Sequence, residues 1–144
     1  MQEVFQNLPV NAGIHRISAA AGVIAMLGGA SVVWAFDPSQ THILPVCPLY
    51  ALTGFACPGC GLTRGFHALF HGDVLSALDF NALLPIWTAL FGYLFLSLTL
   101  TAVRGRGLPW KWVSPSMLFG FLVVLITFGV LRNLPYYPFY ILFP

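Results

Sequence analysis

Charged residues are scarce in this sequence, with six Lys or Arg and four Asp or Glu among 144 residues. A typical soluble domain is roughly a quarter charged, and it needs that polar surface to stay dispersed. The shortage argues against a soluble globular domain, and the 58% apolar content argues against a disordered chain. A net charge of +2 is too weak for a nucleic-acid partner. The composition therefore predicts an integral membrane protein, with the lipid bilayer as its surroundings.

The common catalytic signatures are also missing. The sequence has no Ser/His/Asp set, Walker loop, Gly-rich dinucleotide fingerprint or carboxylate pair. These absences leave enzyme activity open but favour a non-enzymatic role, and nothing in the sequence requires a cofactor.

Three apolar stretches contain no Asp, Glu, Lys, Arg, His or Cys, and they cover residues 17–36, 83–103 and 115–131. About 20 helical residues cross a hydrocarbon core about 30 Å thick, so each stretch predicts a transmembrane helix. The third reaches residue 134 if Arg132 extends, or snorkels, to the membrane interface. A cleaved signal peptide is the alternative for the first stretch, which is longer than the roughly 7–15 apolar residues of a signal. We expect one all-α membrane domain over residues 1–144, with spans at about 17–36, 83–103 and 115–134.

Basic residues lie on one side of these predicted spans. Arg16 precedes the first span, and Arg104, Arg106 and Lys111 lie in the short loop between the second and third. An excess of Lys and Arg marks the cytoplasmic side of a membrane protein. We therefore expect a multi-pass protein with its N-terminus inside, and with the loop 37–82 and the C-terminus outside.

All three cysteines lie in this outer loop. Within Cys57-Pro58-Gly59-Cys60, the Pro-Gly pair is typical of a turn and brings the two sulfurs together. After Gly61 the pattern becomes helical, and Gly72 and Asp73 separate two short amphipathic segments. We expect these two segments to lie on the outer membrane surface as interfacial helices, beside a cysteine knuckle.

The run from Cys47 to Arg64 resembles the bacterial family called domain of unknown function 2752. The family hallmark is a Cys-Pro-x-Cys-Gly-x-Thr-Arg box preceded by a third cysteine. The matching residues are Cys47, Cys57, Pro58, Cys60, Gly61, Thr63 and Arg64. The family has Asn-Pro after the second short helix, where this sequence has Asn81-Ala82 with Asn81 as a predicted helix cap. The resemblance spans roughly residues 45–90 and implies a small protein of the bacterial inner membrane, but no activity.

Three chemical interpretations of the box stay open. In the first, Cys57 and Cys60 form a disulfide that makes the knuckle a rigid docking feature, and the protein is an accessory or assembly subunit of a membrane complex. In the second, the same pair cycles between thiol and disulfide as the catalytic residues of a redox protein. That role would suit Cys60, because the start of a helix and the nearby Arg64 are expected to lower its thiol pKa.

In the third interpretation the box holds a metal ion. Cys47, Cys57 and Cys60 supply three soft ligands, and His67 and His71, which are outside the family hallmark, are candidates for a fourth. A covalent c-type haem is excluded, since Gly61 follows the second cysteine where that motif needs histidine. Sulfur separations distinguish the cases, because a disulfide bond is about 2.05 Å long and zinc-bound sulfurs lie about 3.5–4 Å apart.

The remaining polar residues suggest smaller roles. Thr63 and Arg64, with the N–H groups of the first helical turn, are a candidate anion-binding site, although Arg64 could instead pair with Asp73 or Asp79. Arg132 is interpreted as a snorkelling anchor, with a buried ion pair to an outer-loop Asp as the alternative. The apolar spans also predict a membrane-protein partner or a homo-oligomer.

Overall fold

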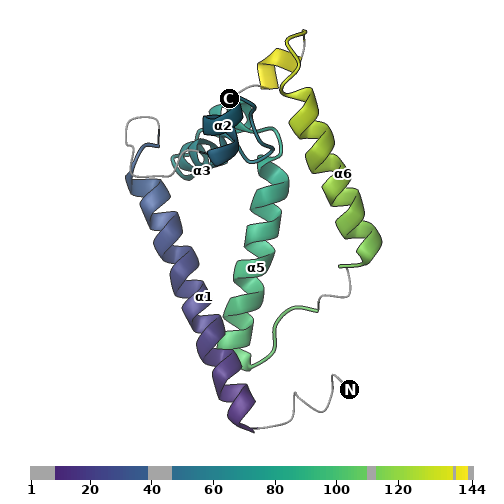
Figure 1. Ribbon diagram of the computed structural model, residues 1–144. Coiled ribbons are helices and arrows are strands. Elements are labelled where there is room, and N and C mark those ends of the chain that lie inside the picture. The colour runs from purple at the N-terminus through teal and green to yellow at the C-terminus, as the bar shows by residue number, and fades with distance from the viewer. Residues whose placement is uncertain (1–8, 39–46, 110–112, 138, 143–144) are drawn as a thin grey trace. The chain divides into compact units, whose positions relative to one another are not determined.

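The computed structural model describes residues 9–38, 47–109, 113–137 and 139–142. The described residues contain helices and no strand, which confirms the predicted all-α class. The long helices are α1 (Pro9–Ala35), α5 (Leu84–Arg104) and α6 (Pro115–Leu131). The short ones are α2 (Pro48–Thr53), α3 (Leu62–Phe70), α4 (Val74–Phe80) and the 3-10 helix η2 (Phe139–Leu142) (Figure 1).

Two of the long helices are apolar and long enough to cross a membrane, namely α1 from Gly13 to Ala35 and α5 from Leu84 to Arg104. Large apolar side chains on them are exposed, such as Ile17 at 72% and Ile24 at 70%, as expected of surfaces that face lipid. α6 is apolar but has 17 residues, a length of about 26 Å. α6 stops at Leu131, short of the predicted limit at residue 134, and its membrane span stays a prediction.

The chain divides into two compact units, and unit 1 comprises the described residues within 1–31 and 87–110. The first half of α1 lies beside the second half of α5 there (Figure 1). The two helices are close enough that a side-chain Cβ at Gly22 would lie only 3.1 Å from the Leu98 side chain. Arg16 donates hydrogen bonds of 3.0 Å to the carbonyls of Ala102 and Val103. Because these carbonyls end α5 and carry its negative dipole, the guanidinium caps the helix.

Unit 2 comprises the described residues within 32–86 and 111–144, and it contains all three cysteines. α3 and α4 pack closely. A side-chain Cβ at Gly65 would lie only 3.1 Å from the carbonyl oxygen of Ala77, and Ala77 is fully buried. The predicted break between them is confirmed, because Gly72 has a φ of 84° and Asp73 accepts a 3.0 Å bond from Ser76 N–H. Hydrogen bonding from the hydroxyl and from the backbone N–H of Ser76 lowers the pKa of Asp73.

α2 was not predicted from the sequence. It begins with Pro48 after the N-cap residue Cys47, and it ends at Gly54, whose φ of 72° few residues other than glycine adopt. This short helix decides where Cys47 lies relative to the other two cysteines.

Candidate functional site

Cys57 and Cys60 lie at the two ends of a tight turn. The Cys60 N–H donates to the Cys57 carbonyl at 3.0 Å, and the Leu62 N–H donates to the Gly59 carbonyl at 3.1 Å. The Cys57 N–H points at the Cys60 sulfur, 3.1 Å away. The predicted Pro-Gly turn is confirmed, and it places a backbone donor where negative charge on sulfur would be stabilised.

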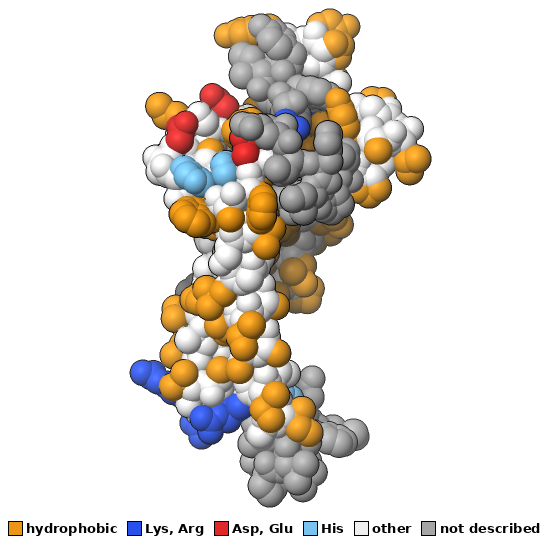
Figure 2. All heavy atoms as spheres, turned by 90° about the vertical axis from the view of Figure 1, so that its left-hand side faces the viewer, with side chains coloured by type: hydrophobic (Ala, Val, Ile, Leu, Met, Phe, Trp, Pro, Cys, Tyr) orange, Lys and Arg blue, Asp and Glu red, His pale blue; other side chains and the backbone are white. Residues whose placement is uncertain are grey.

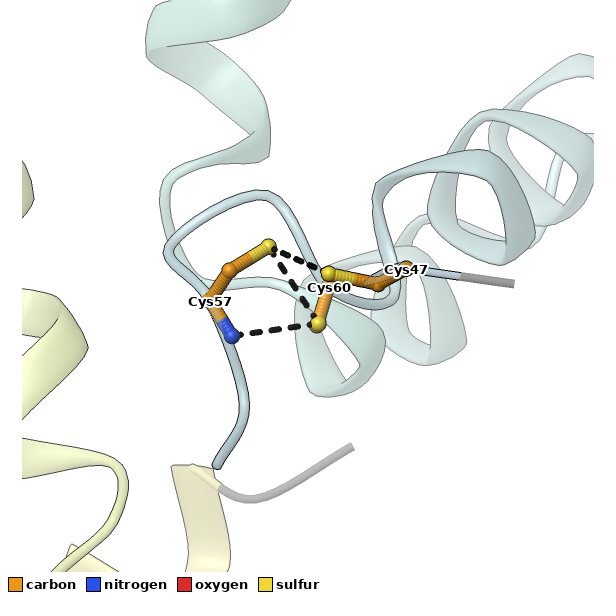
Figure 3. Close-up of side chains that lie close together, drawn as sticks. All are labelled: Cys47, Cys57 and Cys60. Carbon is orange, nitrogen blue, oxygen red and sulfur yellow. Dashed lines mark hydrogen bonds between the residues drawn. The ribbon is translucent and has the colours of Figure 1, made fainter. Parts of the chain in front are cut away.

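The third cysteine joins this turn from the start of α2. The thiols of Cys47 and Cys60 each donate to the sulfur of Cys57, and both sulfur–sulfur distances are 3.3 Å. All three sulfurs lie within 4.8 Å of one another. Figure 3 shows the three side chains pointing toward a common centre. Cys47, Cys57 and Cys60 are called the cysteine cluster below.

The three cysteines are free thiols in this structure. The contacts of 3.3 Å are far longer than a disulfide bond of about 2.05 Å, so no disulfide joins Cys57 and Cys60 here, and a disulfide between them stays a prediction. These contacts are slightly shorter than the roughly 3.5–4 Å between sulfurs that share a zinc ion. Binding of a zinc ion would therefore require the Cys57 sulfur to move a few tenths of an ångström away from each of the other two.

Two thiols of the cysteine cluster differ in pKa. A hydrogen bond from the backbone of Tyr50, in the first turn of α2, lowers the pKa of Cys47 from 9.0 to about 7. Burial raises the pKa of Cys60 from 9.0 to about 12. The expectation that a helix start and Arg64 lower the pKa of Cys60 is therefore wrong, because desolvation by burial raises it. The cysteine with the lowered pKa is Cys47, at the start of a helix that was not predicted.

Two glycines allow this arrangement. Gly61 has a φ of 79°, so the chain turns sharply between Cys60 and α3. A Cβ built on Gly129 in α6 would lie 3.1 Å from the Pro58 ring, so a glycine there lets Pro58 pack against the helix. The glycine of the box thus has a conformational role, and its proline has a packing role.

Asn81 ties the turn to the start of α5. Its amide nitrogen donates to the carbonyls of Pro58 at 2.9 Å and of Cys60 at 3.0 Å. Its amide oxygen accepts from the Leu83 N–H at 2.9 Å, and the side chain is 1% exposed. The predicted capping role is therefore only part of what Asn81 does.

The end of α6 holds the other side of the turn. Arg132 donates from Nη1 to the carbonyls of Cys57 at 2.9 Å and of Cys60 at 3.1 Å. Asn133 exchanges two hydrogen bonds of 2.8 Å with the backbone of Ala56. Sequence reasoning did not assign Arg132 and Asn133 to the site, and the available signal was a pair of polar residues directly after a long apolar run.

The interpretation of Arg132 as a snorkelling anchor is wrong. Its side chain has 0% exposure, and its hydrogen-bond partners are backbone carbonyls of the cysteine turn rather than the carboxylate of an Asp. The reason is that the turn presents two carbonyls beside the end of α6, where the guanidinium can satisfy both.

The two candidate histidine ligands have other partners. His67 Nδ1 bonds to the Val33 carbonyl at 2.7 Å, and His71 Nδ1 bonds to the His67 carbonyl at 2.9 Å. The ring of His71 also stacks on Trp34, with centroids 5.9 Å apart. Within the described residues, the ligand group formed around Cys57 contains the three cysteines and neither histidine.

Thr63 and Arg64 are located in the first turn of α3, and both are exposed. Their predicted anion-binding role stays a prediction, and so does the location of α3 and α4 at a membrane interface.

No curated protein and no solved structure gives a significant match to this chain. A family model does match, over residues 47–95. The matched segment contains the cysteine cluster and Asn81, whereas Arg132 and Asn133 lie outside it. The family is the one described as "Protein of unknown function (DUF2752)", which confirms the resemblance inferred from the cysteine box.

Proposed function

We propose that this protein is a membrane-embedded metal-binding protein that holds one thiophilic ion between Cys47, Cys57 and Cys60. The observation that carries the proposal is the convergence of three free thiols within 4.8 Å. A static disulfide between Cys57 and Cys60 would leave Cys47 without a role. A metal site uses all three sulfurs, and soft thiolates select ions such as Zn²⁺ or Cu⁺.

The number of ligands favours metal handling over a purely structural site. Structural zinc sites are almost always closed by four protein ligands, whereas sites that exchange a ligand keep one position open. The cysteine cluster supplies three ligand atoms among the described residues. A fourth position would then be available to water, to a donor or acceptor of the ion, or to a residue of a partner protein.

The membrane location is the second part of the proposal. We place the protein in the bacterial inner membrane as a multi-pass protein, with the cysteine cluster on the outer side. Support comes from unit 1, where Arg16 bonds to the last turn of α5, next to Arg104 and Arg106. In Figure 2 the blue side chains of this unit gather at that end, a distribution typical of a cytoplasmic face. An accessory or assembly role within a membrane complex is compatible with this proposal and stays a prediction.

A metal titration tests the proposal. The full chain, purified in mild detergent and reduced, is stripped with a chelator and titrated with Co²⁺. We expect saturation at one ion per chain, with thiolate-to-cobalt charge-transfer absorption that disappears when Zn²⁺, which has a filled d shell, displaces the cobalt. Absence of saturable binding by fully reduced protein would overturn the proposal.

Thiol–disulfide exchange is the second candidate, and the central position of Cys57 favours it. Its sulfur lies 3.3 Å from both other sulfurs, so either could become its disulfide partner. In the balanced reaction, Cys57 and Cys60 give two electrons and two protons to a partner's disulfide, which becomes two thiols. Thiol trapping in cells tests this role, and a Cys60→Ser protein that never accumulates a mixed disulfide through Cys57 would exclude it.

A further inference from the structure

Arg132 is a buried cation, and no ion pair among the described residues neutralises its charge. The side chain has 0% exposure, and Nε and Nη2 have no hydrogen-bond partner in the part of the chain that the structure describes. The guanidinium carbon lies 5.0 Å from the centroid of the Phe128 ring, a cation–π contact that compensates its charge only in part. Burying a guanidinium in this way is costly unless a negative charge compensates it.

The negative charge nearest to Arg132 can come from the cysteine cluster. Nη1 already bonds to the carbonyls of Cys57 and Cys60. The thiols of these same two residues are ionisable groups whose negative charge would favour the charged guanidinium. As neutral thiols they leave the cation uncompensated, so the arrangement suits a cluster that carries net negative charge.

Charge arithmetic indicates what such a cluster holds. Three thiolates contribute −3 and a divalent ion +2, so the loaded cluster carries −1, which the +1 of Arg132 cancels. A monovalent ion on the same three thiolates would leave −2, and hence a residual −1 beside the guanidinium. A buried site is most stable when its charges cancel.

We infer that Arg132 is the counter-ion of a three-thiolate site for a divalent, Zn²⁺-like ion. Its positive charge neutralises the loaded cysteine cluster, and its hydrogen bonds hold the cysteine turn in position. This inference rests on the proposed metal-binding function. It adds the charge of the ion and a positioning residue that lies outside the segment matched by the family model.

Substitutions that separate charge from packing test the inference. Arg132→Gln removes the charge and keeps a hydrogen-bond donor, whereas Arg132→Lys keeps the charge. We expect Arg132→Gln to bind Zn²⁺ about 10–100-fold more weakly, the usual effect of losing an outer-shell partner, and Arg132→Lys to retain most of the affinity. Asn133→Ala is the matched control, because it loosens the same end of α6 without changing charge.

The wavelength of the thiolate-to-cobalt band in cobalt-loaded protein distinguishes a change of charge from a loss of packing, because looser packing alone would not shift it. A nearby cation stabilises the sulfur lone pairs, so its loss should shift the thiolate-to-cobalt band of Arg132→Gln to longer wavelength. The bands of Arg132→Lys and Asn133→Ala should stay in place. If Arg132→Gln does not fold, Arg132→Lys carries the test alone.

The possible failures are distinguishable. Wild-type protein that binds no divalent ion overturns the proposed function and this inference together. An Arg132→Gln protein that binds Zn²⁺ as tightly as wild type, with an unshifted cobalt band, overturns the inference alone. A folded Arg132→Lys protein that has lost Zn²⁺ binding overturns it too, because charge would then not be the property that matters.

Discussion

Replacing Cys57 by serine should weaken Zn²⁺ binding by more than about 100-fold, the upper end of the loss seen for outer-shell partners. Cys57 is the central member of the cluster, since its sulfur is the one in contact with both others at 3.3 Å. A serine hydroxyl is a hard, shorter ligand that does not replace a thiolate. Competition with a coloured chelator measures the affinity, and Cys47→Ser should show a loss of similar size.

The matched control for these cysteine variants is His71→Gln. His71 was a candidate ligand from the sequence, but its ring stacks on Trp34 and it lies outside the ligand group around Cys57. We therefore expect His71→Gln to bind Zn²⁺ with wild-type affinity. A loss of affinity in His71→Gln as large as that in Cys57→Ser would show that the ion is not held by the three cysteines alone.

Replacing Asn81 by leucine should destabilise the cysteine turn by at least about 3 kcal/mol, because it removes three hydrogen bonds to backbone groups, of which the Cys60 carbonyl keeps its bond from Arg132. The groups that lose a hydrogen bond are the carbonyls of Pro58 and Cys60 and the N–H of Leu83. The expected result is a lower thermal midpoint in detergent and faster maleimide labelling of Cys60, which is buried in the wild type.

Two further substitutions sharpen this test. Asn81→Asp keeps the oxygen that accepts from Leu83 but points a carboxylate at two carbonyls, so it should be at least as destabilising as Asn81→Leu. Asp79→Asn changes an exposed residue of α4 and should alter neither the midpoint nor the labelling rate. Wild-type stability in Asn81→Asp would mean that the two donated hydrogen bonds contribute little.

The long helices and the break at Gly72 follow from local sequence signals. Apolar runs without charged residues predict α1, α5 and α6, and Gly72-Asp73 predicts the boundary between α3 and α4, because these signals act through the backbone of the segment that carries them. α2 also carries a local signal, Pro48 directly after Cys47, which is typical of a helix start. That signal does not suffice to predict a helix, because six residues are too few to show a helical pattern.

The surroundings of the cysteine cluster could not be predicted in this way. Arg132 bonds to carbonyls that lie 75 and 72 residues earlier in the chain, and Asn133 reaches back 77 residues. Nothing local distinguishes a buried arginine at a helix end from one that reaches the membrane interface. The environment of Cys60 has the same origin, since its burial depends on contacts made by distant segments and reverses the pKa shift expected from its helix start.

X-ray absorption at the zinc edge of the loaded, full-length protein tests the central claim most directly. If Cys47, Cys57 and Cys60 hold the ion, the spectrum should show three sulfur neighbours at about 2.3 Å, with at most one lighter neighbour. In Cys57→Ser the sulfur count should fall. A wild-type spectrum made only of nitrogen or oxygen neighbours at about 2.0–2.2 Å would contradict the account, because the ion would then be bound outside the cysteine cluster.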